Sequence, residues 1–271
     1  MVSRCDYALV AEAVASLYRA AGVCAPGAGW GAGGPGLPAF QRWSGISPAR
    51  FLRSLSEDLP RPSMARPAAS LAGDGRGPLL VRDLFISLEC LEPGADLART
   101  GMRSLDWAML ATPVGRALFA QVDGRLAALA FQPGGNDAAA VAALGRRWPG
   151  FRLRESAAAL IPYRDDLADR LRGRIRRPLA LTLRGTHFQL RVWEALLRIP
   201  EGLTMTCREL AESLGGGATA RAVGAIARRN PIACLIPSHR LVRDGADPRA
   251  DARARPPEPV LLALEDARTG R

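Results

Sequence analysis

The last third of the chain carries the signals that restrict its fold most. Thr186 with Gln189, and Thr206 with Glu209, each place a hydroxyl three residues before a side chain that can return a hydrogen bond. Each pair therefore predicts the first turn of a helix. Three consecutive glycines, 215–217, then interrupt the chain before another helical segment. Two short helices separated by a glycine turn are typical of a helix-turn-helix.

The helix after the glycine turn is expected to have two faces. Helical spacing places on its inward face Thr219, Ala222, Val223 and Ile226. The outward face is expected to carry Arg221, Gly224, Ala225 and Arg228. Small residues between two arginines would let the helix approach a groove wall while the guanidinium groups reach phosphates or the base stack. An ordinary solvated basic face is the alternative interpretation.

Residues 230–240, NPIACLIPSHR, place one of the chain's two histidines directly after a hydroxyl. The loose alternation before Pro237 predicts an extended segment. Pro237 fixes its own φ, so Ser238 and His239 are expected to project from a stiff corner. Taken alone, Ser238 and His239 could form either a solvated turn or a reactive site. Only the surrounding sequence can distinguish these two interpretations.

The middle of the chain alternates between strand-like and helical patterns. The Asp-Gly pair at 123–124 separates two runs of strand length, which is the strongest short signal for a hairpin. The expected elements are strands 107–112, 117–122 and 125–131, a helix over 136–147, a strand at 151–153, a helix around 161–171 and a strand at 179–184. This pattern predicts an α/β subdomain, and it holds no glycine-rich phosphate loop.

The first third is expected to be helical but loosely connected. Apolar spacing predicts an amphipathic helix over 5–21, followed by a Gly/Pro tract at 25–38 that is not expected to join a packed core. Ser47-Pro48 predicts the capped start of a short helix. After a second loose stretch, leucines spaced four residues apart predict a helix over 79–91.

Composition narrows the class of partner. The net charge is +11, and all 37 basic residues are arginines, which favours nucleic acid as a partner. No run of eighteen apolar residues is available to span a bilayer, and the first residues do not resemble a signal peptide, so we expect a cytoplasmic protein. The five cysteines are scattered without a C-x-x-C pair, so neither a metal site nor a disulfide framework is expected.

Residues 185–245 resemble the C-terminal domain of the O6-alkylguanine-DNA alkyltransferases, through the motifs R-A-V-G, N-P and P-x-H-R at these spacings. The resemblance implies a mixed fold, α/β plus α. Residues 98–184 would form the ribonuclease-H-like subdomain, and 185–271 a winged helix-turn-helix domain. In residues 1–97, FQRWSGISPARFL and GPLLVRDLFISLECLEPGAD resemble half of the AraC-type domain of Ada-type regulators, so this segment would be a degenerate helix-turn-helix.

The same resemblance implies roles for particular residues. Asn230 would order the active-site turn, His239 would take a proton through a water, and Glu265 would orient His239. Arg221 would intercalate into duplex DNA as an alkylated guanine rotates into a pocket. The implied DNA-facing positions also include Thr206, Cys207, Ala220, Gly224 and Arg228.

The sequence departs from the family pattern at several of these positions. Ser238 replaces the acceptor cysteine, and an aliphatic hydroxyl is essentially never ionised at neutral pH. Cys207 replaces a tyrosine, and residues 244–259 lack the family's substrate loop. We therefore expect a cofactor-free, monomeric protein that binds double-stranded DNA and recognises O6-alkylguanine without transferring the alkyl group, handing the lesion to an unidentified repair partner.

Three alternatives remain open at this point. The chain could still transfer the alkyl group to another thiol such as Cys207. It could act as an Ada-like transcription regulator through its first 97 residues. It could also be a hydrolase built on Ser238, His239 and Glu265, although such enzymes need an oxyanion hole beside the nucleophile.

Overall fold

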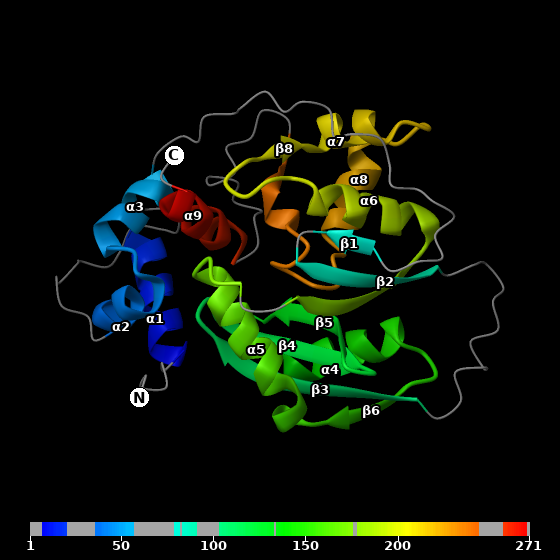
Figure 1. The fold of residues 1–271 in the computed structure, drawn as a ribbon, viewed down its shortest axis with the longest axis horizontal. Coiled ribbons are helices and arrows are strands. Elements are labelled where there is room, and N and C mark those ends of the chain that lie inside the picture. The colour runs from blue at the N-terminus through cyan, green and yellow to red at the C-terminus, as the bar shows by residue number, and fades with distance from the viewer. Residues whose placement is uncertain are drawn as a thin grey trace.

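A computed structural model shows the fold in Figure 1. It describes residues 7–20, 36–56, 79–81, 83–90, 103–132, 134–175, 178–243 and 257–269. None of the helices in these ranges is both long enough and apolar enough to cross a membrane.

A mixed seven-stranded sheet forms the centre of the described structure. Its strands, in spatial order, are β1 (Leu79–Val81), β2 (Leu84–Cys90), β7 (Leu179–Gly185), β5 (Arg125–Phe131), β4 (Gly115–Val122), β3 (Ser104–Thr112) and β6 (Arg152–Glu155). Strands β3, β4 and β5 form an antiparallel meander, whereas β7 is parallel to both of its neighbours. The predicted α/β character of this region is confirmed.

The turn between β4 and β5 is the predicted hairpin. Asp123 and Gly124 have φ values of 48° and 73°, which is the left-handed conformation that a tight two-residue hairpin turn requires. Asp123 also forms an ion pair with Arg103. The alternation along β4 then directs Leu118 toward one face of the sheet and Phe119 toward the other.

Helices cover both faces of this sheet (Figure 1). Helix α4 (Asp137–Arg147) packs through Leu144 with Leu118 and the fully buried Trp148. Helix α5 (Ala157–Leu171) packs on β3 and β4 and belongs to the larger core cluster with Phe119. Both helices lie where the sequence pattern predicted them.

The C-terminal third consists of short helices with well-defined ends. They are α6 (His187–Leu197), α7 (Cys207–Leu214), α8 (Ala220–Ala227), a 3-10 turn η2 (Ser238–Arg240) and α9 (Glu258–Thr269). Both predicted capping boxes are formed, at Thr186 and at Thr206. The two-residue strands β8 (Met205–Thr206) and β9 (Leu241–Val242) pair in parallel. Glycines 215–217 all have positive φ, so they make the predicted turn between α7 and α8.

The helix predicted over 79–91 is wrong, because this segment forms β1 and β2. Strand β2 pairs in parallel with β7 from Leu84 opposite Leu179 to Cys90 opposite Gly185. A four-residue leucine spacing fits one face of a helix, but it is also an even spacing, which fits one face of a strand. The alternating burial of Leu84 and Ile86, with Phe85 exposed between them, shows that the strand period applies.

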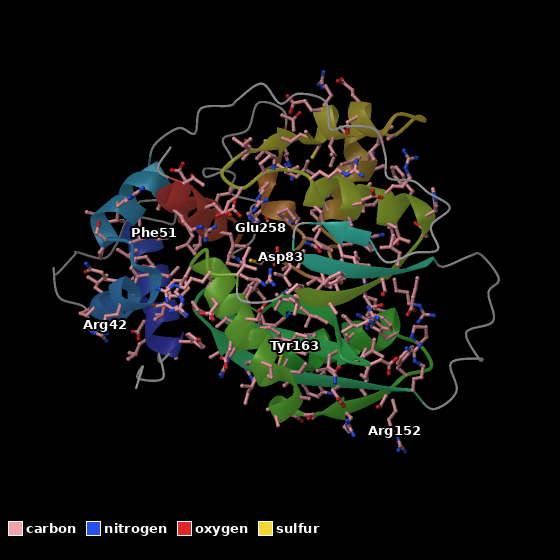
Figure 2. All side chains as sticks on the ribbon, viewed as in Figure 1. Arg42, Phe51, Asp83, Arg152, Tyr163 and Glu258 are labelled. Atoms are coloured by element: carbon pink, nitrogen blue, oxygen red, sulfur yellow. The ribbon has the colours of Figure 1, made fainter. Side chains whose placement is uncertain are left out.

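Three N-terminal helices pack on one another, and the third of them also packs against the C-terminal helix. Helices α1 (Tyr7–Ala20) and α3 (Pro48–Ser56) confirm the predicted helices, with Ser47 capping α3 through a 3.3 Å bond from the amide of Arg50. Helix α3 lies against α9. Its Phe51 (labelled in Figure 2) is completely buried and packs on the ring of Phe40 in α2, with the ring centroids 5.2 Å apart.

The expectation that residues 25–38 stay outside a packed core is wrong for the last of them. Helix α2 (Gly36–Ser44) begins inside that tract, and Gly36 is buried. A Cβ at Gly36 would lie 2.7 Å from the carbonyl oxygen of Leu9, so glycine permits a close approach of α1 and α2. Residues 25–35 and 59–78 lie outside the described residues.

Candidate active site

The turn at residues 230–240 is attached to the central sheet. The amide of Leu129 in β5 donates to the carbonyl of Pro231, and the amide of Ala233 donates back to Leu129, both at 2.9 Å. The predicted extended segment is limited to this bridge. Cys234 has a φ of 70°, and the chain then folds back so that the amide of Ile236 bonds to the carbonyl of Ile232. The stiff corner at Pro237 is present, directly before η2.

Asn230 connects the two ends of this turn. Its side-chain oxygen accepts a hydrogen bond from the amide of Ile232 at 3.0 Å. Its side-chain nitrogen donates to the carbonyl of Ile236 at 2.6 Å and to the hydroxyl of Ser238 at 3.1 Å. The predicted ordering role of Asn230 therefore has a geometric basis, because one amide fixes the turn and orients Ser238.

His239 is directed away from Ser238 and into the protein interior. Its Nε2 lies 2.8 Å from a carboxylate oxygen of Glu265, and the side chain is almost completely buried. Donation from Nε2 leaves Nδ1 as the unprotonated nitrogen of the neutral ring. Nδ1 is buried and has no hydrogen-bond partner within the described part of the chain. No hydrogen bond joins His239 to Ser238 within these residues.

Arg240 is a site residue that the sequence reasoning did not assign. Its guanidinium group donates to both carboxylate oxygens of Glu265, at 2.7 and 3.0 Å, and to the carbonyl of Ile199 at 2.6 Å. A buried arginine needs a carboxylate partner. The arginine of the P-x-H-R motif could therefore have been predicted to be a site residue that pairs with a carboxylate. The partner is 25 residues away in sequence, which the motif alone does not reveal.

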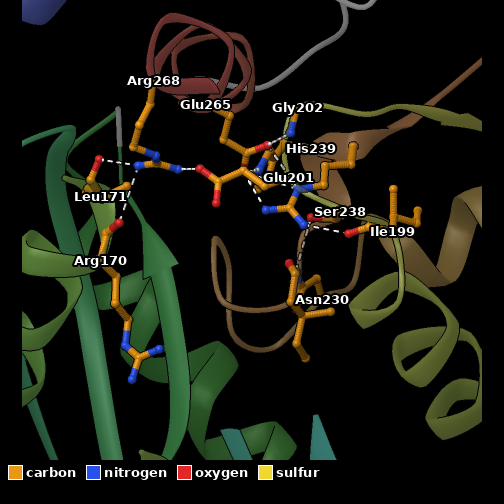
Figure 3. Close-up of polar contacts among 12 residues, drawn as sticks. Arg170, Leu171, Ile199, Glu201, Gly202, Asn230, Ser238, His239, Glu265 and Arg268 are labelled. Atoms are coloured by element: carbon orange, nitrogen blue, oxygen red, sulfur yellow. Dashed lines mark hydrogen bonds and ion pairs between the residues drawn. The ribbon is translucent and has the colours of Figure 1, made fainter. Parts of the chain in front are cut away.

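Glu265 is the point at which these contacts converge (Figure 3). Besides His239 and Arg240, it accepts a bond from the amide of Gly202 at 3.2 Å. Burial alone would raise the pKa of this carboxyl, but attraction and hydrogen bonds from His239, followed by those from Arg240, lower the pKa to about 2. Glu265 is therefore a fixed negative charge that orients a histidine and an arginine.

Helix α9 is itself held in place by a second arginine. Arg268, one turn after Glu265, donates to the carbonyl of Leu171 at 2.7 Å and so satisfies the C-terminal end of α5. Its guanidinium group also forms an ion pair with Glu201 (Figure 3). Arg268 therefore connects α9, the helix that carries the Glu265 carboxylate, to the end of α5 and to Glu201.

The helix-turn-helix positions divide into an exposed and a packed group. Arg221 and Arg228 on α8 are exposed, and no carboxylate pairs with either of them among the residues that the structure describes. Gly224, expected on the outward face, is buried instead, and a Cβ there would lie 3.4 Å from the sulfur of Cys207. Thr219, expected to pack inward, is exposed because it caps α8.

The remaining predicted DNA-facing residues lie at helix N-termini. Thr206 caps α7, where its hydroxyl accepts a 3.1 Å bond from the amide of Glu209. Cys207 and Ala220 are the first residues of α7 and α8, and both are half-buried. The structure therefore brings the predicted positions of α7 and α8 together on one pair of helices. The Ser238 turn follows this pair directly in the chain.

Cys207 and Cys234 are free cysteines, one half-buried at the start of α7 and the other in the Asn230–Arg240 turn. Burial, together with repulsion from Glu265, raises the pKa of the Cys234 thiol to about 12. Such a thiol is almost entirely protonated at neutral pH, and the thiolate is the nucleophile in cysteine chemistry. No group of three or more histidine, cysteine, aspartate and glutamate side chains within the described ranges is arranged to hold a metal ion.

Residues 187–266 match the family described as 6-O-methylguanine DNA methyltransferase, DNA binding domain. A methylated-DNA–protein-cysteine methyltransferase of Mycobacterium leprae is 52% identical over 64 residues, which cover 24% of this chain and 39% of that protein. The corresponding protein of Methanosarcina barkeri is 42% identical over 88 residues, covering 32% and 56% of the two chains.

A regulatory protein ada of Salmonella typhimurium is 36% identical over 146 residues, covering 53% of this chain and 40% of that protein. Two solved structures of Mycobacterium tuberculosis proteins are also similar. OGT in complex with DNA has a TM-score of 0.49 and 28% identity. O6-methylguanine methyltransferase has a TM-score of 0.47 and 27% identity. Each alignment covers 60% of this chain and 94% of the solved one.

The matches span between 39% and 56% of the length of these curated relatives. The family match covers α6 to α8, the Asn230–Arg240 turn and most of α9. Residues 187–266 therefore belong to the DNA-binding domain family of the 6-O-methylguanine DNA methyltransferases, and the chain as a whole is similar to methylated-DNA–protein-cysteine methyltransferases and to a regulatory protein ada.

Proposed function

We propose that this protein binds duplex DNA and recognises O6-alkylguanine rotated out of the helix, without transferring the alkyl group to itself. The observation that carries the proposal is the hydroxyl of Ser238, held by Asn230 at the position that the family resemblance gives to the acceptor cysteine. The surrounding residues keep a geometry suited to a transfer reaction, while the atom that would attack is a weak nucleophile.

The chemistry of transfer explains why the hydroxyl matters. The acceptor atom must form a bond to the alkyl carbon as the bond from that carbon to guanine O6 breaks, and it must give up its proton. A thiol loses its proton near pH 8.5, and a neighbouring base lowers that value, whereas a serine hydroxyl stays protonated. The alkyl carbon also offers no developing oxyanion for backbone amides to stabilise, which is how serine enzymes compensate.

The features around Ser238 are consistent with a retained lesion pocket. Nδ1 of His239 has an unused lone pair, and Glu265 fixes the ring that carries it. In an active relative of this arrangement, that nitrogen would accept the acceptor proton through a water. With Ser238 present, we propose that the same polar groups serve to hold the flipped base and that the alkyl group stays on it.

The DNA contacts are proposed for α7 and α8. Exposed guanidinium groups at Arg221 and Arg228 supply the charge that binds phosphates. The small side chain of Ala225 between them allows the helix to approach the DNA closely. The first turns of α7 and α8 present backbone amides to which phosphate oxygens can bind. Cys207 is too short to replace the tyrosine expected there, so we expect the phosphate of the flipped nucleotide to be held less firmly.

The direct test is a paired titration of matched duplexes that contain either O6-methylguanine or guanine at one position. We expect at least tenfold tighter binding of the methylated duplex, because a modified base costs less to unstack and fits the pocket. Equal and negligible affinity for both duplexes would refute the proposal. Equal but substantial affinity would leave DNA binding in place and refute lesion recognition.

The matched variant is Ser238→Cys, which changes a single atom. If only the acceptor has been lost, incubation of Ser238→Cys with the methylated duplex should add one methyl mass to the intact protein, and the wild type should gain none. Glu265→Gln in the Ser238→Cys background should slow that transfer, because His239 loses its charged partner. A methyl mass that appears on the wild type would contradict the proposed inactivity.

A second candidate is transfer to Cys207, which would explain a methylated wild type. The observation that favours Cys207 over Cys234 is its position as the first residue of α7, half-buried beside α8, whereas the pKa of the Cys234 thiol is raised to about 12. Peptide mapping of a methylated wild type would identify the residue. Methyl transfer that survives in Cys207→Ser would exclude this candidate.

A further inference from the structure

A cavity of about 160 Å³ lies behind the turn that carries Ser238. Its walls come from α9, the end of α5, the start of β2 and the inner side of the turn, including Cys234 and Leu235. Neither Asn230 nor Ser238 is among the described residues that line it. The cavity shares Arg240 and Glu265 with the candidate site but not the residues that hold Ser238, and it lies where the sheet and the C-terminal helices meet, a common place for small-molecule sites.

The walls of this cavity are mainly apolar. Six leucines from five separate segments line it: Leu84, Leu171, Leu197, Leu235, Leu261 and Leu264. Ile175 also belongs to the lining and is 58% exposed, the largest exposure among the large hydrophobic side chains of the described structure. Ile175 therefore forms the solvent-facing edge of the apolar lining.

The charged groups in the lining are already neutralised within the protein. Three arginines are present, and each forms an ion pair with a carboxylate that also lines the cavity: Arg170 with Asp83, Arg240 with Glu265, and Arg268 with Glu201. Asp83 lies directly before β2 (Figure 2). The described residues of the lining therefore carry no net charge, and their chemistry favours a neutral ligand.

The backbone of the cavity wall is strained at one position. Cys234 adopts a φ of 70°, a left-handed conformation that is unfavourable for a residue with a side chain. Such conformations persist where the surrounding structure imposes them, and they cluster at ligand sites. Here the strained residue belongs to the Asn230–Ser238 turn and lines the cavity.

We propose that this cavity binds a small, neutral, apolar molecule about the size of one aromatic ring. A cavity of about 150 Å³ lined by apolar side chains is known to accept benzene, so the volume is sufficient for a single ring. The ligand would rest on the leucines, cover Ile175 and lie against the Arg240–Glu265 pair. This proposal does not depend on the proposed DNA function, because none of the DNA-facing residues contributes to the cavity.

The test uses the full chain and two probes that share a ring. Toluene, the neutral probe, should bind with one-to-one stoichiometry in calorimetry and raise the Tm. Benzoate, the charged probe, should bind at least tenfold more weakly, because its carboxylate would have to enter a lining that offers no unpaired cation. Absence of both heat and a Tm shift with toluene would overturn the proposal, as would equal binding of benzoate.

Two pairs of variants locate the binding. Ile175→Asp should weaken toluene binding at least tenfold, and Ile161→Asp, which changes another exposed isoleucine outside the cavity, should not. Leu84→Phe should fill the cavity and abolish binding, while Leu88→Phe on the same strand should leave it unchanged. Ile175 and Ile161 are both exposed, so their aspartate variants should fold. These two variants therefore still test the proposal if a leucine variant does not fold. Toluene binding that is equal in wild type and Ile175→Asp would refute this location.

Discussion

Two arginines of the C-terminal region, Arg240 and Arg221, have opposite surroundings. Arg240 is buried, and its guanidinium group is bonded to Glu265 and to the carbonyl of Ile199. Arg221 is exposed on α8 and has no carboxylate partner within the described residues. In a chain whose basic residues are all arginine, the residue type alone does not distinguish the two roles. The difference shows that some arginines hold the site together, while others are available to a polyanion.

The largest effect is expected from Arg240→Met. Removing one member of a buried ion pair leaves the other charge without compensation and typically costs about 3–5 kcal/mol. The free energy of unfolding, measured with urea, should fall by this amount. Arg221→Met is the matched control and should change it by less than about 0.5 kcal/mol. Similar losses in the two variants would eliminate the distinction between the arginines.

Acid should remove much of the same stabilisation. The folded-state pKa of Glu265 is lowered to about 2 from an ordinary value of 4.5, so its contribution is complete above pH 4.5 and is lost as the pH falls toward 2. The shift corresponds to roughly 3 kcal/mol. Unfolding free energies of wild type and Glu265→Gln should therefore converge over this pH range. A constant difference between them would show that the Glu265 charge does not carry the effect.

For DNA binding, in contrast to stability, we expect the substitution of Arg221 to have a larger direct effect than that of Arg240. Arg221→Met should weaken binding to duplex DNA by about tenfold at low salt and reduce the slope of affinity against salt by about one ion. Arg152→Met, which removes an exposed arginine on β6 (Figure 2), should alter neither quantity. Equal losses for Arg221 and Arg152 would show that net charge, rather than α8, governs the binding.

The smallest effect is expected for Gly224→Ala on the packed side of α8. Alanine favours a helix over glycine by up to about 1 kcal/mol, while its Cβ would crowd the sulfur of Cys207 at 3.4 Å. These opposing contributions should leave the unfolding free energy within about 1 kcal/mol of wild type. A loss above about 2 kcal/mol would mean that α7 and α8 cannot move apart at this contact.

Local signals in the sequence predicted the parts of the fold that depend on neighbouring residues. The capping boxes at Thr186 and Thr206 and the hairpin at Asp123 were correct because each requires only a few consecutive side chains. The segment that forms β2 was misassigned because a four-residue leucine period fits both a helix and a strand. Only its pairing with β7, about 95 residues away, distinguishes them.

For the candidate site, the family resemblance supplied the residues but not all of their contacts. Asn230, His239 and Glu265 lie in the predicted turn and on the helix that faces it. The role of Arg240 and the left-handed Cys234 were missed, because both are consequences of packing between distant segments. Gly224 was assigned to the wrong face of α8 because glycine has no side chain whose polarity would reveal its surroundings.

The packing of α9 against α3 has a consequence for the order of folding. These helices lie near opposite ends of the chain, and contacts of such long sequence separation form slowly because the intervening chain must first be closed into a loop. Until α9 docks, His239 and Arg240 have no carboxylate to meet. Assembly of the Glu265 contacts should therefore be among the last events in folding, detectable as late protection of the Gly202 amide from hydrogen exchange.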